Sequence, residues 1–321
     1  MSDLRAIPAK LNDGTIIARP RGRAAGIAWA ALTVSIFSGW FVITRFSVTR
    51  ELRIWDITAL RFGIGALLLA PVLIRNRARL PRAAWRMGFV FAVLWGVPFV
   101  LLVALGLSLT SAAQAASIAP TLMPLFAGLF AWAFLGEAQG RWRWSGYAAI
   151  LAGLSLLLLA GAAAGGPPSA AGIGALAAAA AMWAIYTLLF RRSGLAPIES
   201  AALICFWSAV LFLPVYGLGG LSRLDHAGAG EIMLQAVYQG VLMSGVAIFT
   251  FNRAVSLLGS SAATAIIALI PAIASLLAIP ILGEHPTPTE GAAIAVIVAG
   301  VLLAARRPGP PEPSDERREN R

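Results

Sequence analysis

Long apolar stretches separated by short polar ones dominate the pattern of this chain. The stretches are 17 to 24 residues long, close to the roughly 20 residues that a helix needs to cross a hydrocarbon core. Strong turn signals are too few for the roughly ten-residue strands of a membrane barrel. The pattern predicts an all-α integral membrane protein with ten transmembrane helices, at Ala25–Ile43, Ile57–Ile74, Gly88–Leu107, Ala112–Leu135, Trp144–Gly161, Ile173–Phe190, Ser200–Leu218, Ile232–Thr250, Ala262–Leu282 and Thr289–Ala305.

Composition excludes a soluble fold and offers no enzyme chemistry. Of 321 residues, 59% are hydrophobic and 12% are charged, whereas a soluble domain is about half apolar and a quarter charged. The single cysteine, Cys205, permits neither a disulfide framework nor a CxxC metal site. His226 and His285 fall in short predicted external loops. We therefore expect no catalytic residues, no metal and no cofactor.

The basic residues predict the orientation of the helices. With the N-terminus in the cytoplasm, 20 of the 25 Lys and Arg residues lie in inside segments, four lie in outside loops, and Arg61 lies within a span. Cytoplasmic loops carry such an excess. We expect a multi-pass protein of the cell inner membrane with both termini in the cytoplasm. Because the positive charge is spread among loops, the net charge of +11 does not indicate a nucleic-acid partner.

An internal repeat is the most informative feature. Ala115–Glu137 aligns without gaps on Ala262–Glu284, with ten of 23 positions identical, a shared proline and a shared Leu-Gly-Glu ending. Each copy contains five predicted spans, so the second copy enters the membrane from the opposite side. Inverted repeats of this kind are typical of secondary transporters that work by alternating access. The expected organisation is a cytoplasmic N-terminal arm (1–23), a first repeat (24–163), a second repeat (172–305) and a disordered cytoplasmic tail (306–321).

These segments resemble a known family. The two halves are similar to the paired EamA repeats of the drug/metabolite transporter superfamily, through the repeated stretches above, Leu60-Arg61-Phe62, Gly146 and Gly153. One departure is that Gly146 aligns with Ala293, so the second copy lacks that glycine. The resemblance implies a ten-helix carrier of small metabolites, with efflux favoured, and it is nearly silent on the substrate.

Acidic residues are absent from the middle of every predicted span. Asp56, Glu137, Glu231, Glu284 and Glu290 lie at span ends, and the others lie in loops or tails. An intramembrane carboxylate is the usual proton relay and the usual counter-charge for a cationic drug. A carboxylate-coupled multidrug antiporter is therefore disfavoured, and facilitated flux or another means of coupling fits better.

Arg61 is the only charged residue well inside a predicted span. Two interpretations are open. Its side chain snorkels to the external headgroups or pairs with Glu51 or Asp56, or it lines an outer vestibule and attracts carboxylate or phosphate groups.

Four prolines are candidates for helix breaks or gating: Pro120 and Pro124 in the fourth span, and Pro271 and Pro280 in the ninth. Each removes one backbone donor and frees a carbonyl one turn earlier. In a membrane such a carbonyl needs a partner or a wet cavity. Packing kinks and substrate-facing breaks both remain open, and recurrence in both copies slightly favours the cavity.

The resemblance further implies that the first, third, fourth, sixth, eighth and ninth helices line a central cavity. On that basis the substrate-binding candidates are Trp95, Gln114, Trp183, Tyr186, Tyr238 and Gln239. Aromatic walls with few neutral hydrogen-bonding groups suit a small amphipathic metabolite, such as an amino acid.

The expected partners are a small-molecule substrate and membrane lipid, and the choice between monomer and homodimer stays open. A carrier of nucleotide sugars or phosphorylated solutes is the first alternative, favoured if further basic groups converge with Arg61 on the cavity. A passive channel and an intramembrane enzyme are alternatives of other classes; the repeat argues against the channel, and no cluster of catalytic side chains supports the enzyme.

Overall fold

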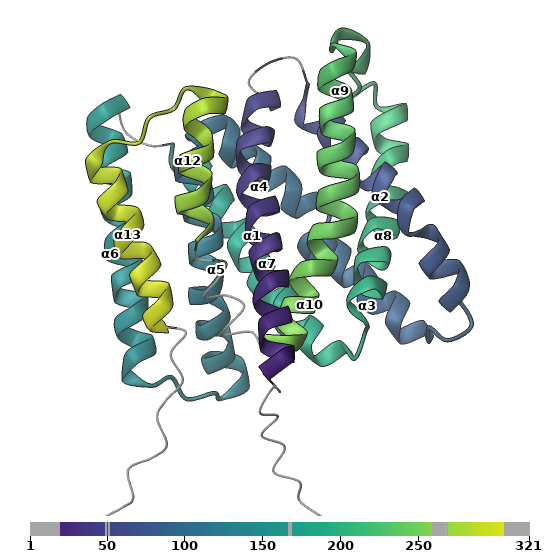
Figure 1. Cartoon of the computed structure of the whole chain (residues 1–321). Coiled ribbons are helices and arrows are strands. Elements are labelled where there is room, and N and C mark those ends of the chain that lie inside the picture. Colours follow the sequence, from purple (N-terminus) through teal and green to yellow (C-terminus); the bar gives the residue numbers. More distant parts are fainter. Residues whose placement is uncertain are drawn as a thin grey trace, which may run out of the picture.

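The chain folds into helices that run side by side along one common direction (Figure 1). A computed structural model describes residues 20–48, 50, 52–165, 169–258, 267 and 269–304, and no strand occurs among them. The elements are α1 (Pro20–Val48), α2 (Ile54–Asn76), α3 (Arg82–Trp95), α4 (Val97–Leu109), α5 (Ala112–Leu135), α6 (Arg141–Gly165), α7 (Ala170–Ser193), α8 (Pro197–Leu218), the 3-10 turn η1 (Leu224–His226), α9 (Ala229–Gln235), the π-helical η2 (Ala236–Ala247), α10 (Ile248–Leu258), α12 (Ile270–Leu282) and α13 (Pro288–Ala304).

Eight described helical segments are long and apolar enough to cross a membrane, and α12 and α13 are shorter apolar helices. Two of the eight are composite: α3 with α4, and α9 with η2 and α10. Each predicted span overlaps one of these segments, but ten crossings stay a prediction. Residues 262–266 and 268 of the predicted ninth span lie outside the described residues, as do most of the predicted N-terminal arm and the predicted tail.

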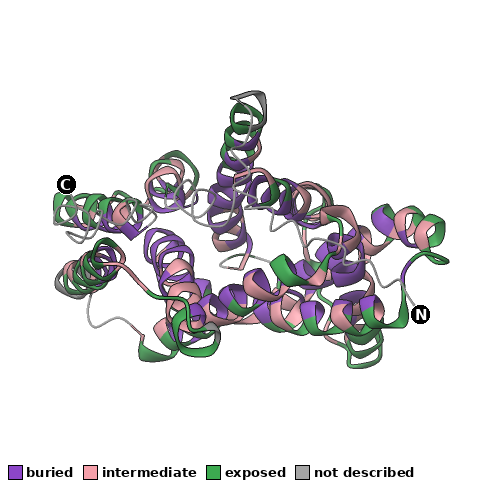
Figure 2. Ribbon diagram, turned by 90° about the horizontal axis from the view of Figure 1, so that it is seen from below, coloured by how far each residue is buried: buried purple, intermediate pink, exposed green. Residues whose placement is uncertain are grey.

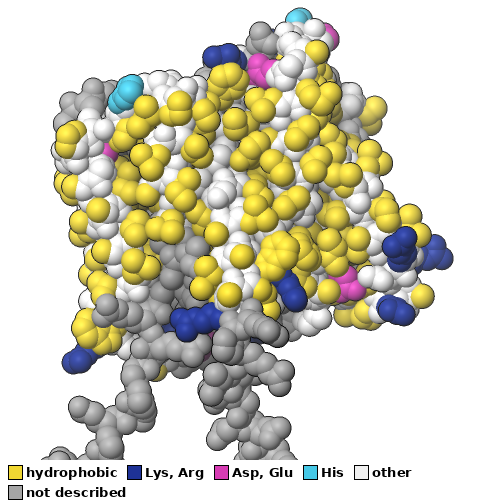
Figure 3. All heavy atoms as spheres, in the orientation of Figure 1, with side chains coloured by type: hydrophobic (Ala, Val, Ile, Leu, Met, Phe, Trp, Pro, Cys, Tyr) yellow, Lys and Arg dark blue, Asp and Glu magenta, His cyan; other side chains and the backbone are white. Residues whose placement is uncertain are grey.

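The outer surface is apolar between two charged ends. Hydrophobic side chains cover the flank visible in Figure 3, and charged side chains lie towards the upper and lower ends of that face. Leu67, Ile74, Phe134 and Leu276 are each well exposed on the outside of the bundle. Buried positions face the interior (Figure 2). So much exposed apolar surface requires a covering, and lipid supplies it.

Helix packing recurs between the two halves of the chain. α1 packs against α10 and α12, while α7, which lies five spans later, packs against α4 and α5. Three further pairs join segments five spans apart: α6 with α13, α2 with α8, and α5 with α12. The start of α1 and the end of α13 lie at the same end of the molecule (Figure 1).

The repeated Leu-Gly-Glu triplet ends a helix in each half. Gly136 and Gly283 follow α5 and α12 with φ of 65° and 70°, a left-handed conformation that glycine adopts without a Cβ penalty. The amide of Glu137 then donates to the carbonyl of Ala131 at 3.1 Å, and that of Gly283 donates to Ile279 at 3.1 Å. The triplet therefore places one glutamate just beyond each helix.

The third and eighth segments are both irregular. At Gly96 the helix stops between α3 and α4, and Pro98 in the first turn of α4 has no amide to donate. A Cβ at Gly96 would overlap the Ala92 carbonyl oxygen and the Ser208 hydroxyl. In the eighth segment, η2 is wound as a π-helix over Ala236–Ala247. Interrupted helices at corresponding places in two halves are the usual pointer to a transporter's binding site.

Glycines bring α6 and α13 close together. The space for a Cβ at Gly146 is taken by backbone atoms of Gly300 and Ala304, and the space at Gly300 is taken by backbone atoms of Gly146 and Ile150. Gly153 lies similarly against the backbone of Ala293. Small residues permit such close approach of helices in membranes.

We predict that Gly300→Val lowers stability by about 1–3 kcal/mol, because the added methyl groups force α6 and α13 apart. Thermal unfolding of the purified protein in detergent measures the effect. Gly291→Val on the same helix is the matched control, since a Cβ there has no neighbour within 4 Å. Equal melting temperatures for the two variants would contradict the packing described.

Candidate functional site

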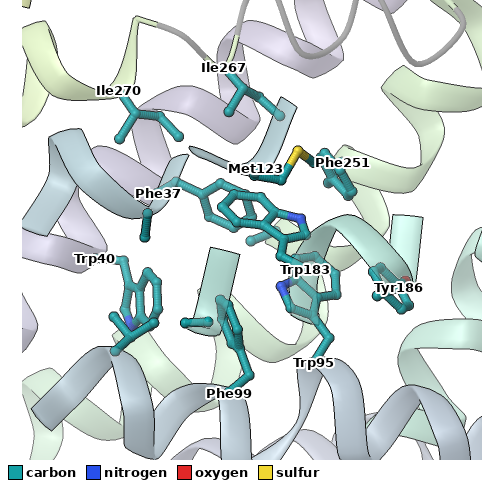
Figure 4. Packing of buried hydrophobic residues seen from close by; sticks show 14 of the residues in the cluster. Phe37, Trp40, Trp95, Phe99, Met123, Trp183, Tyr186, Phe251, Ile267 and Ile270 are labelled. Atoms are coloured by element: carbon teal, nitrogen blue, oxygen red, sulfur yellow. The ribbon is translucent and has the colours of Figure 1, made fainter. Parts of the chain in front are cut away.

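Six aromatic side chains meet at the middle of the bundle. We call them the aromatic cluster (Figure 4): Phe37 on α1, Trp95 on α3, Phe99 on α4, Trp183 and Tyr186 on α7, and Phe251 on α10. The rings of Trp95 and Tyr186 stack at 4.5 Å between centroids, and those of Trp95 and Trp183 at 5.8 Å. Phe37 meets Trp183 edge-on at 5.5 Å. Helices from both halves of the chain contribute to this cluster.

Two donors in the aromatic cluster have no acceptor. The indole Nε1 atoms of Trp95 and Trp183 are buried and have no hydrogen-bond partner in the described part of the chain. Trp and Tyr usually find a partner for their polar atom when they are buried. An unpaired buried donor is costly, so these two groups are suited to bind a polar atom of a ligand.

Tyr186 is held in place by its hydroxyl. The hydroxyl lies 3.1 Å from that of Ser200 on α8 and 3.3 Å from the side-chain oxygen of Asn252 on α10. All three residues are fully buried. This network fixes the ring that stacks on Trp95 and ties α7 to α8 and α10.

A chain of hydrogen bonds joins α1 to η2 beside the aromatic cluster. Trp40 Nε1 donates to Gln239 Oε1 at 3.0 Å, and Gln239 Nε2 donates to Thr44 Oγ1 at 2.9 Å. Trp40 in turn stacks on Phe99, with 6.2 Å between the centroids. Gln239, a predicted binding residue, thus holds Trp40 with its amide oxygen while its amide nitrogen is anchored on Thr44.

Arg61 is buried in the protein, with 1% of its surface exposed. The interpretation that it snorkels to the headgroups or pairs with Asp56 is wrong. The Asp56 carboxylate instead accepts from the Tyr216 hydroxyl at 2.6 Å and from the amides of Arg223 and Arg53. Glu51, the other expected partner, lies outside the described residues. Asp56 is turned away because it lies at the first turn of α2, where the exposed backbone amides need an acceptor.

The Arg61 guanidinium lies against aromatic rings. Its Cζ is 5.1 Å from the Trp40 ring centroid and 5.5 Å from that of Phe62. Desolvated cation–π contacts contribute about 2 kcal/mol, against several kcal/mol for removing an ion from water. Nε and Nη1 have no hydrogen-bond partner within the described residues, so the guanidinium is incompletely compensated.

Two other predicted binding residues lie away from the aromatic cluster. Gln114 forms a capping box at the start of α5, where its side chain accepts from the Ser111 amide at 3.3 Å. Tyr238 donates to the Ile36 carbonyl at 2.9 Å and packs on Gly39, which docks η2 on α1. Trp95, Trp183 and Tyr186 are therefore the predicted residues that the fold brings together, and Gln239 joins them through Trp40.

Three of the four predicted prolines lie inside continuous helices, and a break before Pro271 stays a prediction because residues 259–266 and 268 lie outside the described residues. α5 continues through Pro120 and Pro124, and α12 continues through Pro280. Pro271 lies in the first turn of α12, where an amide is not needed. Each proline removes a single hydrogen bond, so a long packed helix persists across it.

A network of contacts fastens one end of the bundle; we call it the latch. Glu284, just beyond α12, accepts from the Ala112 amide at the start of α5 at 3.0 Å and pairs with Arg45 of α1 at 3.5 Å. Arg45 also donates to the Leu107 carbonyl of α4 at 2.6 Å. A carboxylate at a helix N-terminus is favoured by the exposed amides and the dipole there. The sequence placed Arg45 in an outside loop and Glu284 at a span end, and it did not predict that the two residues pair.

The opposite end of α5 borders a hollow, which we call the polar cavity. Its volume is about 80 Å³, and Glu137, Arg143, Arg191, Thr187 and Gly128 are among its lining residues. Glu137 is the counterpart of Glu284 in the repeat, yet within the described residues it forms no ion pair. Thr187 also donates to the Trp183 carbonyl at 2.9 Å, so the hollow reaches the turn beside the aromatic cluster.

Comparison with known proteins decides the family. The model of the EamA-like transporter family matches residues 24–159 and again residues 170–306. The chain belongs to the EamA-like transporter family. Members of this family are transporters, not enzymes.

Individual relatives carry transport names. The chain is 30% identical over 200 residues, 61% of its length, to a "Probable terminal-alkyne amino-acid exporter" of Streptantibioticus cattleyicolor, and it spans 65% of that relative's length. It is 26% identical over 260 residues to the "Uncharacterized transporter YwfM" of Bacillus subtilis, covering 78% of this chain and 86% of that one. A solved structure titled only "Crystal structure of protein" has a TM-score of 0.64 at 24% identity, over 88% of this chain and 98% of that one, which shows a shared fold.

We predict that Gln239→Leu lowers stability by about 1–3 kcal/mol, because Trp40 Nε1 and Thr44 both lose their partner. Thr44→Val should cost less, since it removes only the second bond. In the double variant the cost of Thr44→Val should nearly vanish, because the two residues act through one bond. Thermal unfolding measures all three, and strictly additive losses would contradict the hydrogen-bond chain.

Proposed function

We propose that this EamA-family transporter exports a small amphipathic metabolite, such as an amino acid, by alternating access. The observation that carries the proposal is a buried aromatic cluster, with a latch at one end of α5 and a polar cavity at the other. A carrier in one of its two end states has this arrangement, with one gate closed and the other side hollowed.

The paired packing of the two halves supports alternating access. Corresponding helices of the two halves pack in the same pairs. The interrupted third segment carries Trp95 of the aromatic cluster, and the irregular eighth segment carries Gln239, which holds Trp40 beside it. An inverted repeat gives the protein two equivalent arrangements of the same contacts, which open the site to opposite sides in turn. A passive channel needs no such pair of arrangements.

The charge distribution supports an inner-membrane protein with both termini in the cytoplasm. The polar cavity then opens to the cytoplasm, and the latch closes the external side. The relative named as an amino-acid exporter supports both the substrate class and the direction. The alternative, a carrier of phosphorylated solutes, needs further basic groups beside Arg61. Arg143 and Arg191 line the polar cavity, and Arg61, which does not line it, is the only fully buried cation among the described residues.

Flux through proteoliposomes tests the function. We expect saturable, protein-dependent flux of at least one compound from a panel of amino acids and related apolar metabolites. Trp95→Leu should raise its KM about tenfold or more, since stacking on aromatic walls is lost. Trp132→Leu on α5, whose ring is exposed, is the matched control with unchanged KM. Absence of saturable flux for the whole panel would contradict the proposal.

The same vesicles test the driving force. The flux should persist when a protonophore abolishes the proton gradient. The fully buried carboxylate in the described part of the chain, Asp56, is engaged by three donors at the start of α2. A carboxylate that accepts from these donors anchors the start of α2, and no acidic residue lies in the middle of a predicted span. Strict dependence on the gradient would contradict this expectation.

The latch has its own test. In a Cys205→Ser background, we expect Glu284→Gln to increase labelling of Thr44→Cys by an external, membrane-impermeant maleimide several-fold. Loss of the charge weakens both the Arg45 pair and the contact with the α5 N-terminus, and Thr44 is buried one residue from Arg45.

Glu290→Gln is the control for the latch, because within the described residues the Glu290 carboxylate accepts hydrogen bonds from Thr287 of its own turn alone. Equal labelling of the two variants would show that the latch does not keep the external side closed. Labelling of Thr44→Cys solely from the cytoplasmic side would reverse the orientation.

A further inference from the structure

The interior of the bundle contains a cation that lacks an anion. Arg61 is 1% exposed, and two of its three nitrogen atoms, Nε and Nη1, have no hydrogen-bond partner in the described residues. Removing a charge from water is repaid only by an opposite charge or by well-placed acceptors. Neither is provided by the described residues around this side chain.

The groups packed near Arg61 are already engaged or are neutral. Ser244 of η2 donates to the backbone carbonyl of Arg61 at 2.8 Å, so its hydrogen points to the main chain. Gln239 Oε1 accepts from Trp40. Cys205 of α8 donates towards the Ser244 carbonyl at 3.9 Å. Asp56, at the start of α2, accepts from three other donors.

Arg61 is continuous with the aromatic cluster. Its guanidinium lies 5.1 Å from the Trp40 ring, which stacks on Phe99, and Phe99 is 6.1 Å from Trp183 and 6.2 Å from Trp95. The unpaired indole donors of Trp95 and Trp183 lie in the same cluster. Unused donors thus lie at two places along one continuous run of aromatic rings.

We propose that Arg61 binds the carboxylate of the transported compound, and that the apolar body of that compound lies on the aromatic cluster. This inference rests on the proposed function and names the chemical class of the substrate. The planar guanidinium fork matches a carboxylate with two parallel hydrogen bonds. The indole donors then serve a further oxygen of the same molecule.

A single buried cation selects a monoanion. A phosphate ester carries nearly two negative charges at neutral pH, and Arg61 is the only fully buried cation that the described ranges contain. The second charge would remain uncompensated in the interior. A carboxylate leaves the site neutral.

Matched pairs of probes test this inference by binding to the purified protein. Phenylacetate with phenylacetamide, isocaproate with isocaproamide, and N-acetyl-leucine with N-acetyl-leucinamide each differ only in the charged group. Tryptophan fluorescence and thermal shift give the dissociation constants. We expect at least one carboxylate to bind roughly tenfold or more tightly than its amide, as is usual for hydrogen bonds to a charged group.

The variants assign that preference to Arg61. Arg61→Met should abolish the difference between acid and amide, and Arg61→Lys should keep part of it, because the charge remains while the fork is lost. Arg253→Met on α10, where the side chain is exposed, is the matched control and should keep the full preference. Thermal unfolding without probe verifies that each variant is folded. Arg61→Lys keeps the test valid should Arg61→Met not fold.

Several results would overturn the inference: no carboxylate of the panel binding more tightly than its amide, a preference that survives in both Arg61 variants, or tighter binding of phenyl phosphate than of phenylacetate. Its failure is distinguishable from failure of the proposed function. If neutral compounds show saturable flux that Arg61 variants do not change, the proposed export of amphipathic metabolites stands and the carboxylate site is rejected. If carboxylates bind in an Arg61-dependent way but no compound shows flux, the carboxylate site stands and the proposed export is contradicted.

Discussion

A polar group inside hydrocarbon finds no water, so every such group must be satisfied by the protein or by what the protein carries. Most of the interior obeys this constraint through local pairs, such as Gln239 with Trp40 and Thr44, and Tyr186 with Ser200 and Asn252. Among the described residues the exceptions are Arg61, Trp95, Trp183, Thr121, Ser208, Glu231, Gln235 and Ser275. Three of them, Arg61 and the indoles of Trp95 and Trp183, lie along one run of aromatic rings. Where the rule is broken, a ligand is the natural partner.

The constraint also explains why so much of the fold could be predicted from sequence. Spans need long apolar runs, and α12 ends at Leu282 as the predicted ninth span does. Residues 262–266 and 268 of that span lie outside the described residues. The family follows from the doubled motif, which the match over both halves bears out. Helix interruptions were harder to predict. Prolines in α5 leave it intact, whereas Gly96 and the π-helical turns of η2 give no comparably strong signal.

The sequence indicated which residue types would form the candidate site, but it did not indicate which residues each of them would contact. Trp95, Trp183 and Tyr186 were singled out as aromatic residues near mid-span, and they meet. Gln114 has the same polarity as Gln239, but its position at the first turn of α5 commits it to capping. Depth along a helix does not tell which way a long side chain points. The sequence therefore left two interpretations of Arg61 open, one at the headgroups and one in an outer vestibule, and its guanidinium lies against Trp40 in the interior.

The glycine caps that follow α5 and α12 bear on which of its two conformations the empty carrier favours. The same tripeptide places one glutamate just beyond each helix, so the two glutamates differ in their surroundings. Glu284 meets Arg45 and a helix start, whereas Glu137 borders a hollow. If the protein works by alternating access, this difference in surroundings favours the state in which the Glu284 end is closed and the Glu137 end is hollow.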